Sequence, residues 1–154
     1  MRINLGAGNF IEKGFINHDL TKHRPEIDIY FDLNSKSWLN EILHFDLYDK
    51  VEFDEIKAFD VIEHLDDPIN FMNNCWDLLK PDGMLYLKAC GWQNPNFWVD
   101  ITHKRAFDIK SFDYFDPETE LGRAYGFYTN KRWRIISKNF DRRMNVIIKM
   151  KPIK

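Results

Sequence analysis

The segments Ile3-Asn4-Leu5-Gly6-Ala7-Gly8 and Phe15-Ile16-Asn17-His18-Asp19-Leu20 decide the fold of this chain. In the first, a short apolar run ends in Gly-Ala-Gly, and in the second a similar run ends in an aspartate. Glycines after a buried strand let the backbone turn tightly and approach a ligand, because they have no Cβ. A carboxylate at the end of the next strand is well placed to accept hydrogen bonds from ribose hydroxyls. These two strands therefore predict a nucleoside-binding site.

Composition restricts the class of protein. The chain has 154 residues, of which 44% are hydrophobic and 16% aromatic, and this is enough to fill the core of one domain. The formal charge of −2 provides no basic field for nucleic acid or an anionic membrane. Cys75 and Cys90 lie far apart, which favours a reduced, cytoplasmic setting. Because no apolar run approaches 18 residues and the N-terminus lacks signal-peptide features, we expect no membrane association.

The hydrophobic pattern predicts an α/β fold. Strands alternate with helices, which implies parallel pairing through crossovers, and the last two strands suggest an antiparallel edge. We therefore expect a Rossmann-like, doubly wound, mostly parallel sheet with an antiparallel C-terminal edge strand and minimal, truncated helices. The expected strands span residues 3–5, 15–20, 27–31, 55–62, 84–89, 132–137 and 144–150, and the segment 91–130 is expected to be irregular.

Two helices are expected between these strands. One spans residues 37–45. The other begins at Pro68 with Asp67 as its N-cap, has an apolar stripe that reaches Leu79, and is stopped by Pro81-Asp82-Gly83.

In an open α/β sheet, ligands bind beyond the carboxyl ends of the strands. Residues 6–9, Asp19, Asp32, 59–64 and 90–92 all lie at or near such ends. We therefore expect these segments, although distant in sequence, to meet in one crevice.

Taken together, these segments resemble the class I S-adenosylmethionine-dependent methyltransferases, and in particular the small type 11-like group. The likeness covers roughly residues 2–92 in collinear order. The matching motifs are Asn4-Leu5-Gly6-Ala7-Gly8, Phe15-Ile16-Asn17-His18-Asp19-Leu20, Asp32-Leu33-Asn34, Phe53-Asp54-Glu55-Ile56, Val61-Ile62-Glu63-His64-Leu65-Asp66-Asp67-Pro68 and Leu78-Leu79-Lys80-Pro81-Asp82-Gly83-Met84-Leu85.

The resemblance implies S-adenosylmethionine as cofactor and assigns roles by position. The glycine loop would pass under the methionine and ribose, Asp19 would bind the ribose hydroxyls, and Asp32 with Leu33 would meet the adenine. Asp60 would lie by the methionine end. The full set of implied cofactor-binding residues is Gly6, Ala7, Gly8, Asn9, Asp19, Asp32, Leu33, Phe59, Asp60 and His64.

The chain departs from the family pattern in its helices. Only residues 9–14 separate the first two strands, and the chain begins at the first strand, so the helices that commonly cover the pocket are expected to be missing. A partner subunit would then complete the site, and we expect a homo-oligomer.

A second cluster, from Asp100 to Phe107, has a Thr-His-x-Arg-x-Phe pattern that the same family places on the substrate side. His103 is the candidate general base, because its ordinary pKa suits proton transfer, and Asp100 would orient it. Lys104 and Arg105 would hold an anionic group of the substrate, and Trp92 would wall the pocket.

Each candidate also has a purely structural interpretation. Lys104 and Arg105 can form a surface salt-bridge pair, and Asp32 can cap the next element. Asp60 and Glu63 can be surface carboxylates, and His64 can brace the loop. No paired spacing of histidine, cysteine or carboxylate residues supports a metal site, so none is predicted.

The sequence thus favours methyl transfer to a small-molecule acceptor within one domain, 1–154. Residues 1–92 would hold the cofactor, 93–130 would form a substrate-side insertion, and 131–154 would supply C-terminal β segments. Two alternatives stay open: a non-catalytic binding or assembly module with a degenerate site, and an enzyme that cleaves S-adenosylmethionine itself.

Overall fold

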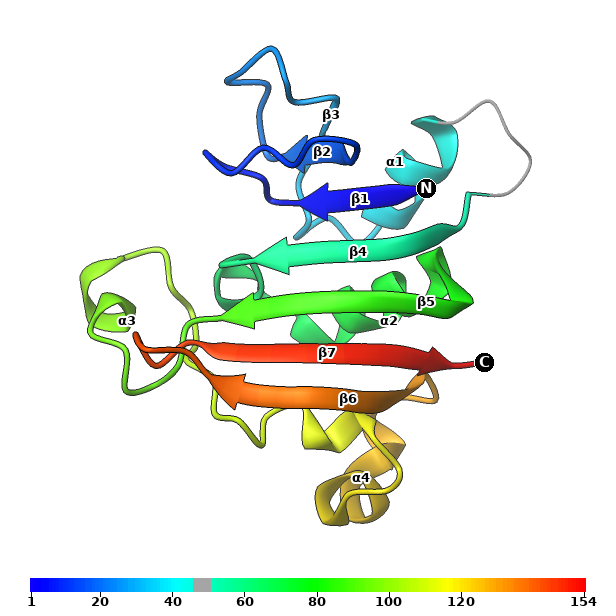
Figure 1. The fold of residues 1–154 in the computed structure, drawn as a ribbon, viewed down its shortest axis with the longest axis vertical. Coiled ribbons are helices and arrows are strands. Elements are labelled where there is room, and N and C mark those ends of the chain that lie inside the picture. The colour runs from blue at the N-terminus through cyan, green and yellow to red at the C-terminus, as the bar shows by residue number, and fades with distance from the viewer. Residues whose placement is uncertain (46–50) are drawn as a thin grey trace.

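The computed structural model describes residues 1–45 and 51–154, which form a seven-stranded sheet in the order β3-β2-β1-β4-β5-β7-β6 (Figure 1). Strands β1 to β5 pair in parallel, and β7 is antiparallel to both of its neighbours, β5 and β6. The expected fold class, a mostly parallel Rossmann-like sheet with an antiparallel C-terminal edge, is confirmed. The strands are β1 (Arg2–Leu5), β2 (Ile16–Asp19), β3 (Ile29–Tyr30), β4 (Phe53–Phe59), β5 (Leu79–Ala89), β6 (Arg132–Phe140) and β7 (Val146–Ile153).

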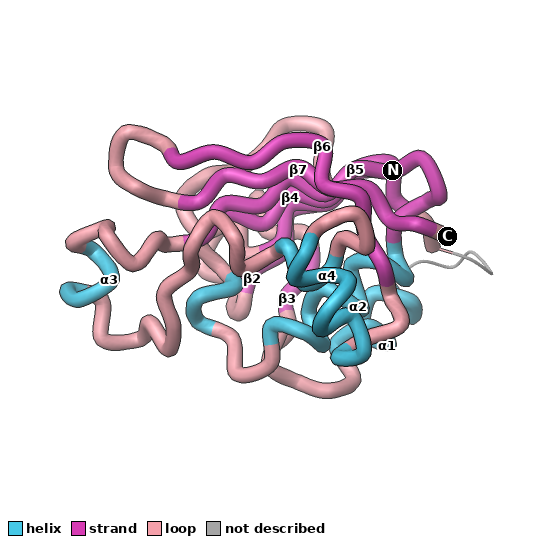
Figure 2. Tube along the Cα trace, turned by 90° about the horizontal axis from the view of Figure 1, so that it is seen from below, coloured by secondary structure: helices cyan, strands magenta, loops and turns pink. Residues whose placement is uncertain are grey.

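The helices are short, as expected. They comprise α1 (Trp38–Phe45), α2 (Pro68–Leu78), α3 (Asn96–Val99), α4 (Glu120–Tyr125) and the 3-10 turns η1 (Ile62–His64), η2 (Asp113–Phe115) and η3 (Gly126–Tyr128). Figure 2 shows α1, α2 and α4 on the same side of the sheet. Within the described ranges, no helix is long and apolar enough to cross a membrane.

The core lies between this helical layer and the sheet. Alternate residues of the central strands, such as Ile56, Leu87 and Ile148, are buried together with Phe71 and Met72 of α2. Successive side chains of a strand point to opposite faces, so the intervening residues lie on the other face of the sheet. There, lysine ammonium groups cover aromatic rings: Lys57 lies 4.6 Å from the ring centroid of Phe15, and Lys149 lies 5.2 Å from that of Tyr86.

Helix α2 begins as the sequence predicts. Asp67 caps it by accepting a hydrogen bond from the N–H of Asn70 at 2.9 Å, and Pro68 is its first residue. It ends earlier than expected, at Leu78, and Leu79 already belongs to β5. A residue before proline disfavours the helical region, which forces Lys80 out of the helix and lets β5 begin before Pro81. The register between β4 and β5 shifts next to this segment, between Phe53 and Glu55.

Three other expectations need correction. Strand β4 ends at Phe59 rather than at Ile62, because Asp60 adopts a positive φ of 57° and the chain turns into η1. The segment 91–130 holds short helices, and Thr119 caps α4 by accepting from the N–H of Gly122. The last strands are joined by residues 141–145 rather than 138–143, since β6 continues to Phe140 and β7 begins only at Val146.

Candidate functional site

The carboxyl ends of β1, β4 and β5 point to the same edge of the sheet (Figure 1). Two cavities that share Asp60 and His64 lie at these strand ends. The first, which we call the glycine crevice, has a volume of about 320 Å³ and brings together seven expected cofactor residues: Gly6, Gly8, Asp19, Asp32, Leu33, Asp60 and His64. The convergence expected from the sequence is therefore present for these residues.

The loop after β1 requires glycine at one position for steric reasons. Gly6 has a φ of +66°, and a Cβ built on it would lie 2.3 Å from Cγ2 of Val61. Gly8 also has a positive φ, +52°, but a Cβ there would meet no atom within 4 Å. The N–H of Gly8 donates to the Asp19 carboxylate at 2.6 Å, so that the loop and the end of β2 are joined directly.

His18 supports this loop from below. Its Nδ1 accepts from the N–H of Gly6 at 3.3 Å, which leaves Nε2 to donate to the carbonyl of Phe31 at 3.0 Å. Burial lowers the pKa of His18 to about 4, so that the ring is neutral. The sequence did not indicate His18 as a residue of the cofactor site, although it directly precedes Asp19 at the end of β2.

Two of the carboxylates that line the glycine crevice, those of Asp19 and Asp32, also stabilise turns. Asp19 Oδ1 accepts from the N–H of Leu20 at 2.6 Å, and Asp32 Oδ1 accepts from the N–H of Asn34 at 2.8 Å. Asp32 therefore stabilises a turn at Asn34 rather than capping the next helix, α1, which begins at Trp38, and the same side chain lines the crevice. A carboxylate has about four acceptor sites, so the two backbone bonds to Asp19 and the one to Asp32 leave capacity for ribose or adenine donors.

The second cavity, which we call the polar pocket, has a volume of about 410 Å³. Its lining includes Asp100 and His103, the expected catalytic pair, as well as several residues that the sequence did not indicate. Among these, Asn94 Nδ2 donates to Asn145 Oδ1 at 2.6 Å across 51 positions of sequence. Lys88 and Arg143 also line the pocket, and the ammonium group of Lys88 pairs with Asp60.

Glu63 is fully buried at the base of the polar pocket, so its interpretation as a surface carboxylate is wrong. Its Oε1 accepts from the N–H of Cys90 at 2.9 Å, whereas Oε2 has no hydrogen-bond partner in the part of the chain that the structure describes. Burial raises the pKa of Glu63 to about 7.

Thr102 connects the two histidines of the pocket through Asp100. Its hydroxyl donates to Asp100 Oδ1 at 2.6 Å and lies 2.9 Å from Nδ1 of His64. The other carboxylate oxygen, Asp100 Oδ2, lies 3.8 Å from Nε2 of His103. The hydrogen bonds from Thr102 lower the pKa of Asp100, and burial lowers the pKa of His64.

Ligand atoms of three residues gather at this point. Glu63, His64 and His103 each offer one atom, and these atoms lie within 4.8 Å of one another. The rings of His64 and His103 meet edge to face, with 4.7 Å between their centroids. Nδ1 of His103 is buried and, within residues 1–45 and 51–154, has no hydrogen-bond partner.

The other expected site residues do not line either cavity. Lys104 donates to the carboxylate of Asp66 at 2.6 Å, and Arg105 donates to the backbone carbonyl of Asp66 at 2.9 Å. These contacts match the interpretation of the two residues as a surface pair. Trp92 donates to Asp108 at 3.1 Å. Ala7 is buried within the glycine loop, Asn9 is exposed, and the Phe59 ring lies under the ammonium group of Lys88.

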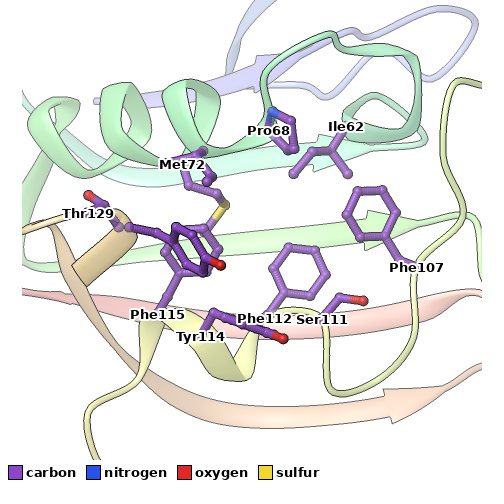
Figure 3. A pocket seen from close by; sticks show the side chains of 11 residues that line it. Ile62, Pro68, Met72, Phe107, Ser111, Phe112, Tyr114, Phe115 and Thr129 are labelled. Atoms are coloured by element: carbon purple, nitrogen blue, oxygen red, sulfur yellow. The ribbon is translucent and has the colours of Figure 1, made fainter. Parts of the chain in front are cut away.

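A third, apolar cavity of about 200 Å³ lies between α2 and the segment 107–115 (Figure 3). Its walls include Met72, Phe112 and Phe115. None of the residues expected in the cofactor or catalytic site lines it, and the sequence did not predict it.

Comparison with known proteins agrees with this geometry. Residues 28–87 match the family model described as a methyltransferase domain, whereas no curated protein matches the sequence. Among solved structures, the chain resembles an S-adenosylmethionine-dependent methyltransferase from Archaeoglobus fulgidus, with a TM-score of 0.62 and 13% identity over 97% of this chain and 85% of that one. A second such methyltransferase, from Clostridium acetobutylicum, gives a TM-score of 0.61 and 11% identity over 97% of this chain and 82% of that one.

A third structure, the methyltransferase CalH in complex with SAH, gives a TM-score of 0.60 and 14% identity over 98% of this chain and 51% of that one. The resemblance to the class I S-adenosylmethionine-dependent methyltransferases is thus confirmed. The chain has their fold, and its central part matches the methyltransferase domain model.

Proposed function

We propose that this protein transfers a methyl group from S-adenosylmethionine, held in the glycine crevice, to a small-molecule acceptor held in the polar pocket. The observation that carries the proposal is the junction of the two cavities at Asp60 and His64. A donor and an acceptor placed on either side of this junction would meet without leaving the protein. The family model and the SAH complex of CalH support the choice of cofactor.

The residues of the glycine crevice fit such a cofactor. The loop lacks side chains at Gly6 and Gly8, which allows close approach of the ribose and methionine, and Asp19 supplies a carboxylate for the ribose hydroxyls. Asp32 and Leu33 would contact the adenine. We further propose that residues 1–92 hold the cofactor, whereas the acceptor side also needs Arg143 and Asn145 from the C-terminal part of the chain.

When bound, the cofactor supplies a methyl group on a positively charged sulfur. An oxygen or nitrogen atom of the acceptor would take this methyl group, and the electron pair of the broken bond would stay on the sulfur. Alignment of the two reactants in line provides most of the acceleration. The acceptor's proton would pass to His103, with Asp100 holding the imidazole.

The test of this role compares His103→Asn with His44→Asn, a substitution at an exposed histidine of α1. Loss of a general base lowers turnover by about 100- to 10,000-fold, and we expect this for His103→Asn with unchanged affinity for S-adenosylmethionine. A panel of hydroxyl, amine and carboxylate acceptors, with S-adenosylhomocysteine measured by mass spectrometry, supplies the turnover readout. An equal loss of turnover and cofactor affinity, or no loss, contradicts the catalytic role.

The same assay separates the alternatives. A nucleoside product other than S-adenosylhomocysteine would indicate cleavage of the cofactor itself. A protein that binds neither S-adenosylmethionine nor S-adenosylhomocysteine by calorimetry, in monomer and oligomer fractions alike, would be a binding or assembly module.

A further inference from the structure

We propose that Glu63, His64 and His103 form a binding site for one divalent transition-metal ion at the base of the polar pocket. The proposal goes beyond methyl transfer, since metal binding requires neither cofactor nor acceptor. The sequence spacing predicts no metal site, because residues 63, 64 and 103 come from two segments that only the fold brings together.

The first observation is a pair of buried ligand atoms that lack partners. Oε2 of Glu63 and Nδ1 of His103 are both buried, and the described residues offer neither of them a hydrogen bond. A buried polar atom without a partner loses free energy relative to its hydrated state. A metal ion in contact with both atoms would satisfy them together.

The second observation is the orientation of the two imidazoles. The hydroxyl of Thr102 engages Nδ1 of His64, which leaves Nε2 of His64 to serve as ligand. Asp100 faces Nε2 of His103 and so leaves Nδ1 of His103 to face the ion. Carboxylates and hydroxyls that hold the second nitrogen of a histidine are typical of metal sites, where they fix the ring and its tautomer.

The distances and charges also suit a cation. Bonds from a metal to nitrogen or oxygen of about 2.0–2.2 Å place the ligand atoms of one ion roughly 3–3.5 Å apart. The ligand atoms now lie within 4.8 Å of one another, so small movements of these three side chains, which line the pocket wall, would bring them into this range. The pocket lining holds the carboxylates of Asp60, Glu63 and Asp100 against the cations of Lys88 and Arg143, so that an ionised Glu63 gives a surplus of negative charge for a divalent ion.

Two imidazoles and one carboxylate form a donor set that suits Zn²⁺, Co²⁺ or Fe²⁺ and leaves at least one coordination position open. That position faces the polar pocket, so the site would take an acceptor that offers a hydroxyl or carboxylate oxygen. The lone pair of His103 cannot bind an ion and accept a proton at once. An occupied site would therefore replace the general base assigned to His103 above.

Direct titration of the purified full chain with Zn²⁺, and with Co²⁺ followed by visible absorption, tests the site without cofactor. We expect one ion per chain. Removal of a group that only orients a ligand already weakens metal affinity by about 10- to 100-fold, so we expect a loss of at least about tenfold in Glu63→Gln and in His103→Asn, which remove a ligand itself. His44→Asn should bind as the unsubstituted protein does. Equal affinity in all variants, or an equal loss in His44→Asn, overturns the proposal.

A second measurement uses the unsubstituted protein, so it does not depend on the folding of any variant. The chain has five histidines, and their ring signals in NMR spectra report on ligation one by one. We expect Zn²⁺ to shift the signals of His64 and His103 and to leave those of His18, His23 and His44 in place. Shifts confined to the latter three overturn the site. Because no cofactor is present, these outcomes are independent of whether the protein transfers methyl groups.

Discussion

The backbone N–H of Gly8 donates a hydrogen bond to the Asp19 carboxylate, with 2.6 Å between N and Oδ2. The carboxylate that is expected to bind the ribose therefore also fixes the loop on which the ribose would lie. Cofactor contact and loop geometry depend on one side chain, and its removal affects both.

Asp19→Ala should weaken the affinity for S-adenosylmethionine. A hydrogen bond to a charged group contributes about 1.5–3 kcal/mol, and every 1.4 kcal/mol is about tenfold in affinity, so we expect roughly 10- to 100-fold weaker binding by calorimetry. Asp82→Ala, at an exposed aspartate of β5, is the matched control. Unchanged affinity in Asp19→Ala would show that the ribose lies elsewhere.

The two loop glycines should differ in their tolerance of alanine. Alanine at either position has to adopt the left-handed backbone conformation, which costs about 1–2 kcal/mol. Only at residue 6 does the new Cβ also overlap a neighbour, since it lies 2.3 Å from Cγ2 of Val61. We expect Gly6→Ala to lower the free energy of unfolding by about 2–4 kcal/mol and Gly8→Ala by about 1 kcal/mol. Urea unfolding measures both. Val61→Ala, added to Gly6→Ala, should recover part of the loss, and a lack of any recovery would reject the steric explanation.

His18 should make the fold sensitive to acid. Its pKa is lowered from 6.5 to about 4 in the folded protein, so between these pH values the unfolded chain binds the extra proton and the folded chain does not. The contribution of the neutral His18 ring to the free energy of unfolding is fully present above pH 6.5. It decreases as pH falls towards 4, by about 3 kcal/mol in total. Protonation would also place a donor at Nδ1 against the donating N–H of Gly6.

Urea unfolding at pH 7 and pH 4.5 checks this, with the difference between the unsubstituted protein and His18→Gln as the quantity of interest. The difference removes the contribution of the carboxylates, which both proteins share. If both lose the same free energy of unfolding on acidification, His18 does not titrate as described.

Local pattern was enough to predict most of the fold. The start of α2 depends on Asp67 and Pro68 alone, and the cofactor-side strands are set by apolar runs bounded by glycine or aspartate. The extent of β5 depends instead on its register with β4, which no local pattern contains.

The candidate site divides in the same way. Residues that follow directly from a strand end, such as Gly6, Asp19 and Asp32, line the glycine crevice as expected. The burial of Glu63 depends on the N–H of Cys90, and Asn94 meets Asn145 from the far end of the chain, so neither could be predicted from the sequence alone. Lys104 and Arg105 have charges that suit a substrate anion, but the partner that the fold places beside them is Asp66.

The insertion of β7 between β5 and β6 has a consequence for synthesis of the chain. Strand β5 is complete at Ala89, but its second neighbour is made of residues 146–153, so one edge of a long apolar strand stays unpaired until these residues emerge from the ribosome. Exposed apolar edges invite pairing with other chains. A nascent chain that stalls before residue 146 is therefore expected to aggregate, and soluble yield should depend on chaperones that shield β5 during translation.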